Sequence, residues 1–192
     1  DVADYIGDSF YLSKVATKVS QDRIIFAGVE FMGESAKILN PKKRVFMPDM
    51  NADCPMAHMA DKDEILALRE KYDDLAVVCY INSTAELKKY SDVCVTSSNA
   101  VKIVKNLPNK NIFFIPDRNL GSYVAKQCPD KNFIFNNGCC PRHVVITKDM
   151  VLKAKELHPE ARFAAHPECT EDVLAFADYV GSTSGIIDYV VD

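Results

Sequence analysis

Residues 79–98, CYINSTAELKKYSDVCVTSS, align without a gap with residues 165–184, AHPECTEDVLAFADYVGSTS. The two stretches are 86 residues apart, and a third, shorter copy is ADYIGDS at residues 3–9. The Cys-Pro pairs at 54–55 and 140–141 repeat at the same offset. A unit of about 87 residues is too long for a solenoid repeat and has the size of a small α/β module. The sequence therefore predicts three homologous modules.

Short β-rich runs alternate with helix-like segments along the whole chain. Strands are expected over 23–28, 44–49, 75–82, 92–97, 111–117, 132–136, 161–166 and 178–183. Helices are expected over Glu30–Leu39, Lys62–Tyr72, Ala85–Tyr90, Ala100–Val104, Lys148–Leu157 and Glu171–Phe176. This alternation is typical of parallel sheets covered by helices. The predicted fold class is α/β, with three homologous three-layer α/β/α modules in a pseudo-threefold arrangement around a central site.

The repeat divides the chain into modules over residues 1–60, 61–146 and 147–192. By the repeat length, the first module lacks its amino-terminal part and the third lacks its carboxy-terminal part. We therefore expect the sequence to be a partial record of a longer protein.

Composition narrows the possible functions. The 192 residues are 48% hydrophobic and 26% charged, which excludes a disordered chain, collagen and a coiled coil. With 23 Lys+Arg against 27 Asp+Glu and no basic cluster, the chain is not expected to bind nucleic acid. No apolar run reaches the roughly 18 residues of a membrane span, and the first twenty residues do not resemble a signal peptide. We expect a cytoplasmic protein with small-molecule partners.

A hydroxyl residue recurs where a strand ends and a helix opens, at Ser9, Ser97 and Thr183. The carboxyl ends of parallel strands are common ligand sites, and free N–H groups at helix starts favour phosphate or carboxylate. Ser and Thr are also good N-caps, so a structural role is the better explanation of each residue on its own. Recurrence at one repeat position makes a shared anion site as good an explanation as capping.

Two triplets occupy equivalent strand ends, seventeen residues before Ser97 and Thr183 respectively. They are Tyr80-Ile81-Asn82 and His166-Pro167-Glu168. Residues i and i+2 share one face of a strand, so the outer two side chains of each triplet are expected to project together. Tyr and Asn, or His and Glu, would supply hydrogen bonds and proton-transfer groups to a ligand. The alternative interpretation of His166 to Glu168 is a simple strand-ending turn.

Seven cysteines cannot all pair as disulfides, so a metal or catalytic role has to be considered. Cys79 and Cys94 lie in apolar runs and are expected to be buried core residues. Cys54 and Cys140 are repeat-equivalent, each before Pro, and suit a metal or cluster held by one thiolate per module. The third cysteine of such a set would fall near position 227, about 44 residues after Thr183, beyond this sequence.

Seven motifs resemble the quinolinate synthase family of bacterial NAD biosynthesis, in that family's order. They are DVADYIGDSFYLS, GVEFMGESAKILNP, CYINSTAELKKYSDVCVTSSNAV, IPDRNLG, GCCPRH, AHPEC and DYVGSTSG. The resemblance covers essentially all 192 residues.

The resemblance implies that iminoaspartate and dihydroxyacetone phosphate condense to quinolinate, with loss of phosphate and water, at a [4Fe–4S] cluster. Cys54 and Cys140 would be two of its three cysteine ligands, and the iron left without a cysteine could act as a Lewis acid. The implied catalytic residues are Tyr80, His166 and Glu168. The implied substrate pocket also includes Ser9, Asn82, Ser97 and Thr183. An L-aspartate oxidase or dehydrogenase would supply the labile iminoaspartate.

Two alternatives remain open on the residues alone. One is an inactive or truncated small-anion-binding α/β protein that holds no cluster. The other is a zinc hydrolase built on Cys54, Cys140, His143 and His166, although the chain lacks a helical HExxH pattern.

Overall fold

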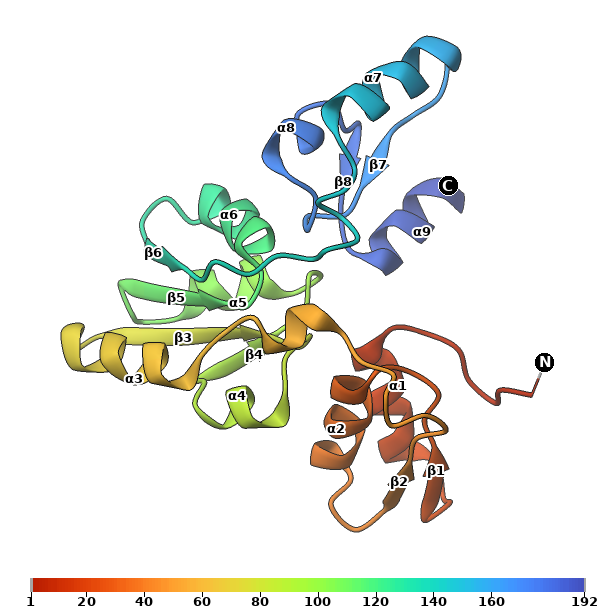
Figure 1. Cartoon of the computed structure of the whole chain (residues 1–192), viewed down its shortest axis with the longest axis vertical. Coiled ribbons are helices and arrows are strands. Elements are labelled where there is room, and N and C mark those ends of the chain that lie inside the picture. The colour runs from red at the N-terminus through yellow and green to blue at the C-terminus, as the bar shows by residue number, and fades with distance from the viewer. Residues whose placement is uncertain (1, 192) are drawn as a thin grey trace.

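A computed structural model describes residues 2–191, whose strands form three separate parallel sheets (Figure 1). The middle sheet has the order β4-β3-β5-β6. Its strands are β3 (Leu75–Tyr80), β4 (Val93–Val95), β5 (Asn111–Ile115) and β6 (Asn132–Phe135). The two-stranded sheets are β1 (Arg23–Ile25) with β2 (Arg44–Phe46), and β7 (Ala164–Ala165) with β8 (Tyr179–Val180). The prediction of an α/β chain with parallel sheets is confirmed, and each strand lies within a predicted run but is shorter.

The middle sheet is the centre of a three-layer sandwich. Side chains that alternate along β3 pack on opposite faces, because successive residues of a strand point to opposite sides. Ala76 and Val78 contact the helices on one face, and Leu75 and Val77 contact those on the other. The covering helices are α5 (Ala100–Asn106) and α6 (Arg118–Gln127) on the first face, and α3 (Lys62–Lys71) and α4 (Ala85–Lys89) on the second.

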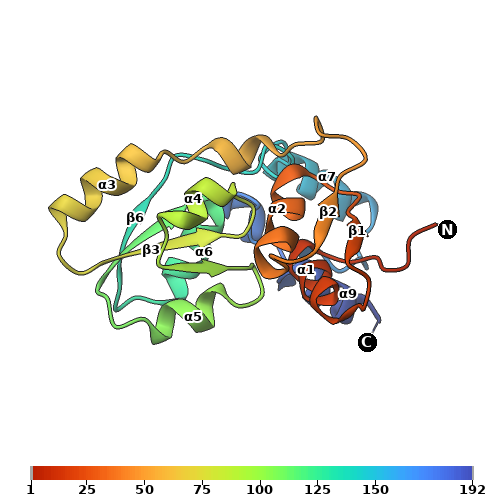
Figure 2. The same ribbon diagram turned by 90° about the horizontal axis from the view of Figure 1, so that it is seen from below.

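The other two sheets each have helices of their own, and we refer to each sheet with its helices, in chain order, as the first, middle or third unit. The first carries α1 (Ser9–Lys18) and α2 (Glu30–Leu39), and the third carries α7 (Lys148–Leu157), α8 (Glu171–Leu174) and α9 (Thr183–Val191). A short 3₁₀ helix, η1 (Pro55–His58), leads from the first unit to the middle one. Figures 1 and 2 show that the first and third units both lie where the strands of the middle sheet end.

The 86-residue repeat is visible in side-chain contacts. Asp92 Oδ2 accepts hydrogen bonds from the Val77 N–H at 2.7 Å and from Arg69 at 2.8 Å. Asp178 Oδ2 accepts from the Phe163 N–H at 2.7 Å, and Lys155 Nζ lies 3.3 Å from it. All three members of the second set follow those of the first by 86 residues. In both units an Asp directly before or at the turn into one strand therefore binds a backbone N–H of the neighbouring strand segment and a cation on a helix.

A second contact occurs at equivalent positions of the first unit and of the middle unit. Lys43 Nζ donates to the Val19 carbonyl at 2.5 Å, and Lys131 Nζ donates to the Leu107 carbonyl at 2.6 Å. Both pairs are related by 88 residues, and so are the bounds of α2 and α6. The repeat thus reaches the level of individual hydrogen bonds in all three units.

The prediction for the two strand cysteines is half right. Cys79 is fully buried between β3 and the helices α3 and α4, whereas Cys94 is exposed. Cys94 lies on β4, the edge strand of the middle sheet, where burial is incomplete even within an apolar run.

Within residues 2–191, no helix combines the length and the apolar character needed to cross a membrane.

Candidate functional site

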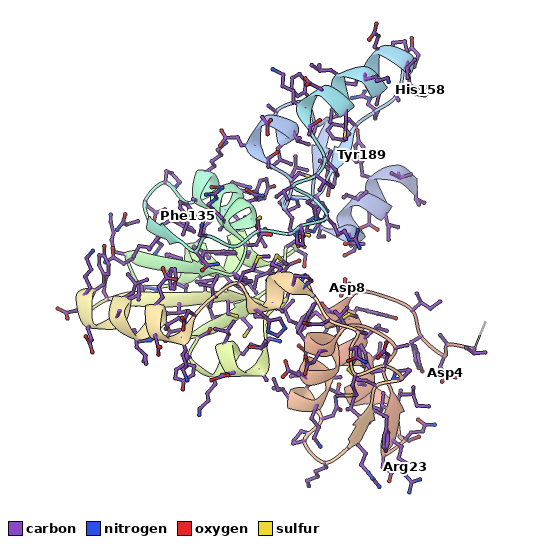
Figure 3. The ribbon with its side chains drawn as sticks, in the orientation of Figure 1. Asp4, Asp8, Arg23, Phe135, His158 and Tyr189 are labelled. Carbon is purple, nitrogen blue, oxygen red and sulfur yellow. The ribbon has the colours of Figure 1, made fainter. Side chains whose placement is uncertain are left out.

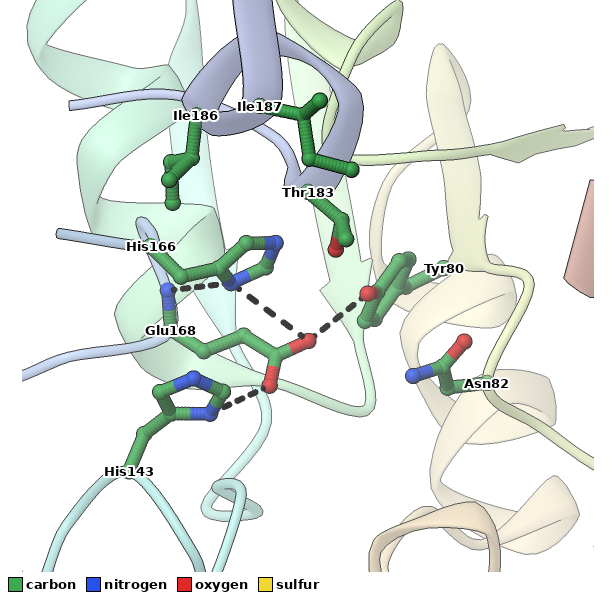
Figure 4. A pocket seen from close by; sticks show the side chains of 8 residues that line it. All are labelled: Tyr80, Asn82, His143, His166, Glu168, Thr183, Ile186 and Ile187. Atoms are coloured by element: carbon green, nitrogen blue, oxygen red, sulfur yellow. Dashed lines mark hydrogen bonds and ion pairs between the residues drawn. The ribbon is translucent and has the colours of Figure 1, made fainter. Parts of the chain in front are cut away.

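A cavity of about 430 Å³ opens between the middle and third units (Figure 4). Tyr80 ends β3 and Asn82 follows it, while His166 and Glu168 follow β7. The residues that line the cavity are Tyr80, Asn82, His143, His166, Glu168, Thr183, Ile186 and Ile187. The structure therefore brings together five residues that the sequence nominated from two strand ends and one helix start.

Glu168 is the centre of a hydrogen-bonded group in this cavity, with only 4% of its surface exposed. Tyr80 donates its O–H to Oε1 at 2.7 Å, and His143 Nδ1 lies 2.8 Å from Oε2. The Glu168 N–H donates to His166 Nδ1 at 3.3 Å, and the rings of His143 and His166 stack with centroids 5.2 Å apart. One carboxylate thus connects the ends of strands in two different units.

These contacts set the protonation of each group. Burial would raise the pKa of Glu168, but hydrogen bonds from His143 and Tyr80 outweigh it and lower that pKa to about 2. Hydrogen bonds to Cys140 and Glu168 raise the pKa of His143 to about 10. Burial, together with the charge of Glu168, raises the pKa of Tyr80 well above its ordinary value. Near neutral pH the group is therefore a carboxylate held between an imidazolium and a protonated phenol.

His166 differs from His143. Burial lowers its pKa, so the ring is neutral near pH 7. Because Nδ1 accepts the Glu168 N–H, the ring proton is on Nε2, which points toward the side of the cavity lined by Thr183 (Figure 4).

The loop after β5 supports both halves of the site. Asp117 is fully buried, and its Oδ1 accepts from the Leu120 N–H at 2.9 Å and its Oδ2 from the Cys140 N–H at 3.1 Å. Two residues on, Asn119 Nδ2 donates to the Glu168 carbonyl at 3.0 Å. Burial raises the pKa of Asp117 to about 6. This loop fixes the backbone at Cys140 and at Glu168 together.

Cys54 and Cys140 both contact the core cluster that includes Tyr80. Both thiols are free, and the charge of Cys140 helps to raise the pKa of Cys54 after the larger effect of burial. The Ala57 N–H donates to the Cys54 carbonyl at 2.9 Å, and the nearby backbone N–H groups of Met56 and Ala57 partly oppose the effect of burial on the pKa of Cys54. Two free thiols on one core cluster have the chemistry that a thiolate-bound metal group requires of its ligands.

A different trio of possible metal ligands is closer together. Ligand atoms of Cys140, His143 and Glu168 all lie within 4.8 Å of one another. Cys54 and His166, which the zinc alternative requires, do not belong to this trio.

The three recurring hydroxyls have separate outcomes. Ser9 and Thr183 begin α1 and α9, and Ser97 lies in the turn before α5. The side-chain caps come from neighbours instead, because Asp8 accepts from the Tyr11 N–H and Ser182 from the Gly185 N–H. Thr183 lines the cavity. Ser9 and Ser97 are not in its lining as residues 2–191 define it, so their place in a substrate pocket stays a prediction.

Sequence reasoning missed two supports and underrated one residue. Asp117 and Asn119 lie in the motif IPDRNLG, which was noted without a role. His143 entered only the zinc alternative, although it is the residue that joins Cys140 to Glu168. Its position three residues after Cys140, directly following a Cys-Pro turn, was the available signal.

Figure 3 shows Asp8, the N-cap of α1, on the side of the first unit that faces the other two. Known proteins with the same sequence pattern point to one family. A family model described as "Quinolinate synthetase A protein" matches residues 1–192. The quinolinate synthase of Fusobacterium nucleatum is 61% identical over 191 residues, which is 100% of this chain and 64% of that protein.

Two further quinolinate synthases give the same picture. That of Caldicellulosiruptor saccharolyticus is 55% identical over 98% of this chain and 62% of its own length. That of Clostridioides difficile is 50% identical over 100% of this chain and 63% of its own length. The chain thus spans less than two thirds of each of these relatives. On the family match and these identities, the chain belongs to the quinolinate synthetase A protein family.

Proposed function

We propose that the cavity between the middle and third units is part of the active site of a quinolinate synthase. The reaction would condense iminoaspartate with dihydroxyacetone phosphate to quinolinate, releasing phosphate and water. The observation that carries this proposal is the buried chain of hydrogen bonds from Tyr80 through Glu168 to His143, beside His166 in one cavity. Condensation and dehydration both require proton transfers, and connected hydrogen bonds between titratable side chains can carry a proton.

Tyr80 is the proposed proton relay. Its phenol is protonated and already donates to Glu168, so a substrate proton taken up by the phenol oxygen can be matched by release of the phenol proton to the carboxylate. Until Glu168 receives that proton, the imidazolium of His143 balances the charge of its carboxylate.

His166 is the proposed electrophilic partner. A neutral imidazole with its proton on Nε2 can donate a hydrogen bond to a substrate oxygen and stabilise charge that develops there. Asn82, on the opposite wall, would orient the substrate with its amide.

Anionic groups of the substrates would bind near the start of α9. Thr183 lines the cavity at the first residue of that helix, where free N–H groups and the helix dipole favour a carboxylate or phosphate. Ser9, at the start of α1, and Ser97, in the turn before α5, are proposed to serve the same purpose.

Cys54 and Cys140 are proposed to hold a [4Fe–4S] cluster with a third thiolate outside this sequence. Such a cluster supplies a Lewis-acidic iron that favours loss of water from a bound hydroxyl. The proposed modules remain those of the repeat, over residues 1–60, 61–146 and 147–192, arranged about a pseudo-threefold axis. A labile iminoaspartate would come from an L-aspartate oxidase or dehydrogenase.

The test is anaerobic expression of the protein with its natural ends, followed by iron and sulfide analysis and by assay of quinolinate from the two substrates. About four irons per chain and quinolinate formation would support the proposal. A metal-free protein that binds phosphate or dicarboxylates without turnover would replace it with anion binding. Stoichiometric zinc would instead support the trio of Cys140, His143 and Glu168.

A further inference from the structure

Two cysteines that the proposed mechanism does not use face each other across neighbouring strands. Cys79 on β3 and Cys94 on β4 are register partners in a parallel ladder, so their side chains project on the same face. Neighbouring strands lie about 4.8 Å apart, within the 4.4–6.8 Å range of Cα separations in disulfides. Cys79 is fully buried, whereas Cys94 is exposed to solvent. The Cys94 thiol can therefore react with a solute, whereas the Cys79 thiol can be reached only through Cys94.

Polar groups surround these two thiols. Lys88 on α4 is half-buried, and its charge acts on both sulfurs while its Nζ donates to Ser35 Oγ at 2.9 Å. The hydroxyl of Ser83 is fully buried and has no hydrogen-bond partner of ordinary geometry among residues 2–191. The neighbouring Cys94 thiol and the charge of Lys88 lower the pKa of Cys79 to about 7 against the effect of burial, and the closeness of Cys79 together with burial raises the pKa of Cys94. The two sulfurs therefore titrate as a pair in which Cys79 is the more acidic thiol and Cys94 holds its proton.

The repeat supplies an internal comparison. In the third unit, the residues 86 positions after Cys79 and Cys94 are Ala165 and Val180, which pair in the same register. The equivalents of the three polar neighbours, Ser83, Lys88 and Ser91, are Cys169, Leu174 and Ala177. Most of this second set packs in one apolar cluster. The fold therefore does not require sulfur at these positions, and in the middle unit the polar neighbours occur together with the thiols.

We propose that Cys79 and Cys94 form a modification site, a dithiol that closes to a disulfide between two neighbouring parallel strands. The oxidant is a low-molecular-weight disulfide such as oxidised glutathione. The exposed Cys94 thiol passes its proton to the Cys79 thiolate beside it and attacks one sulfur of the oxidant, whose S–S bond breaks and releases one thiolate. The Cys79 thiolate then attacks the Cys94 sulfur and displaces the second thiolate. The two protons of the protein thiols pass to the two leaving thiolates, and the oxidant takes up two electrons.

The location gives this bond a consequence. Cys79 directly precedes Tyr80, and β4 leads within two residues to Ser97. A disulfide brings Cβ atoms to about 3.8 Å, closer than side chains of neighbouring strands ordinarily lie, so the two strand ends must move together. Oxidation would therefore act on the strand that carries the proposed proton relay.

Oxidised glutathione added anaerobically to the folded protein tests the site, with free thiols then alkylated and peptides mapped by mass spectrometry without reduction. The wild-type chain should yield a peptide linked through Cys79 and Cys94. In Cys79→Ala, Cys94 should stay trapped as a mixed disulfide with glutathione, at a level about tenfold above that in the wild type. Cys94→Ser should give neither species.

Lys88 offers a finer control. Lys88→Gln should slow formation of the linked peptide severalfold, and Lys88→Arg should restore the rate, because a nearby cation favours the thiolate. A wild-type chain that accumulates glutathione on Cys94 as strongly as Cys79→Ala, or that leaves both thiols free to alkylate, would overturn the proposal. The readout is thiol chemistry alone, so it is independent of whether the chain makes quinolinate.

Discussion

Glu168 shows how single residues set the chemistry of the site. A buried carboxylate costs several kcal/mol unless it is paired and hydrogen-bonded. Glu168 meets that condition with His143 on one oxygen and Tyr80 on the other. Each partner is changed in return: after the hydrogen bond with Cys140, Glu168 raises the pKa of His143, and after burial, Glu168 raises the pKa of Tyr80. The three residues therefore act as one titrating group, and a change in any of them is felt by the other two.

Tyr80→Phe isolates the phenol hydroxyl at this scale. The ring still packs in the core, so folding should be retained, but the hydrogen bond to Glu168, and with it the proposed proton relay, is lost. We expect kcat for quinolinate formation to fall by about 100-fold or more, with a much smaller change in KM. The matched control is Tyr90→Phe, in a half-buried tyrosine away from the cavity. Full turnover in Tyr80→Phe would show that the phenol carries no proton.

Asp117→Asn tests the support beneath the site. The amide can still accept from the Leu120 N–H, but its NH₂ group would face the Cys140 N–H, leaving that buried donor unsatisfied. We expect the free energy of unfolding in urea to fall by about 1–3 kcal/mol. Asp130→Asn, in the exposed turn before β6, is the control and should change it little. Equal effects of the two substitutions would mean that the contact with Cys140 adds no stability.

At the scale of elements, most of the fold was readable from the sequence. Hydrophobic period and repeat together predicted every strand and six helices, because each element is locally amphipathic or apolar. The strands came out shorter, since β7 and β8 form only two ladder pairs and the flanking residues leave the sheet. A helix over 118–127 was not named, although α2 shifted by 88 residues has these bounds. Its first residues, RNLGS, are mostly polar or Gly, so the apolar period of a helix is weak there. Only the repeat relation to α2 would have predicted this helix.

Asp178→Asn tests the repeated strand contact in the third unit. The hydrogen bond from the Phe163 N–H, then the Lys155 cation, lower the pKa of Asp178 below its ordinary value of 3.8. The contact therefore stabilises the fold above that value, and its contribution is lost as pH falls through the lowered pKa. In Asp178→Asn we expect the Phe163 amide hydrogen to exchange faster with solvent at neutral pH. The free energy of unfolding should also depend less on pH in the acid range.

Asp188→Asn is the control for this contact. Its carboxylate makes no hydrogen bond or ion pair within the described chain, so exchange at Phe163 should match the wild type. An unchanged exchange rate in Asp178→Asn would show that the strand start is held by the sheet alone.

At the scale of the whole molecule, the site exists only because different units meet. Tyr80 enters the cavity from the middle sheet and Glu168 from the third unit, and the proposed ligand Cys54 lies directly before the η1 turn. The repeat predicted these residues because each occupies a strand end or a Cys-Pro turn that recurs. It could not predict His143, whose repeat equivalent is Ala57, or the loop that carries Asp117 and supports two units at once. Contacts made between copies of a repeat leave no periodic trace in the sequence.

The adjacent cysteines 139 and 140 allow the proposed metal site to be tested with neighbouring residues of one loop. Cys140 touches His143 and lies in the core cluster with Cys54, whereas Cys139 is half-buried and outside that cluster. After anaerobic reconstitution of the protein with its natural ends, Cys140→Ser should lower bound iron by about tenfold or more, and Cys139→Ser should leave it unchanged. Removing the metal with a chelator should lower the melting temperature of the wild type and of Cys139→Ser, because a ligand that binds only the folded state stabilises it. Cys140→Ser should lack that response, since it has no metal to lose. If both serine variants kept their iron, the ligands would have to be sought elsewhere, and the meeting of the units at this point would be left to serve substrate binding alone.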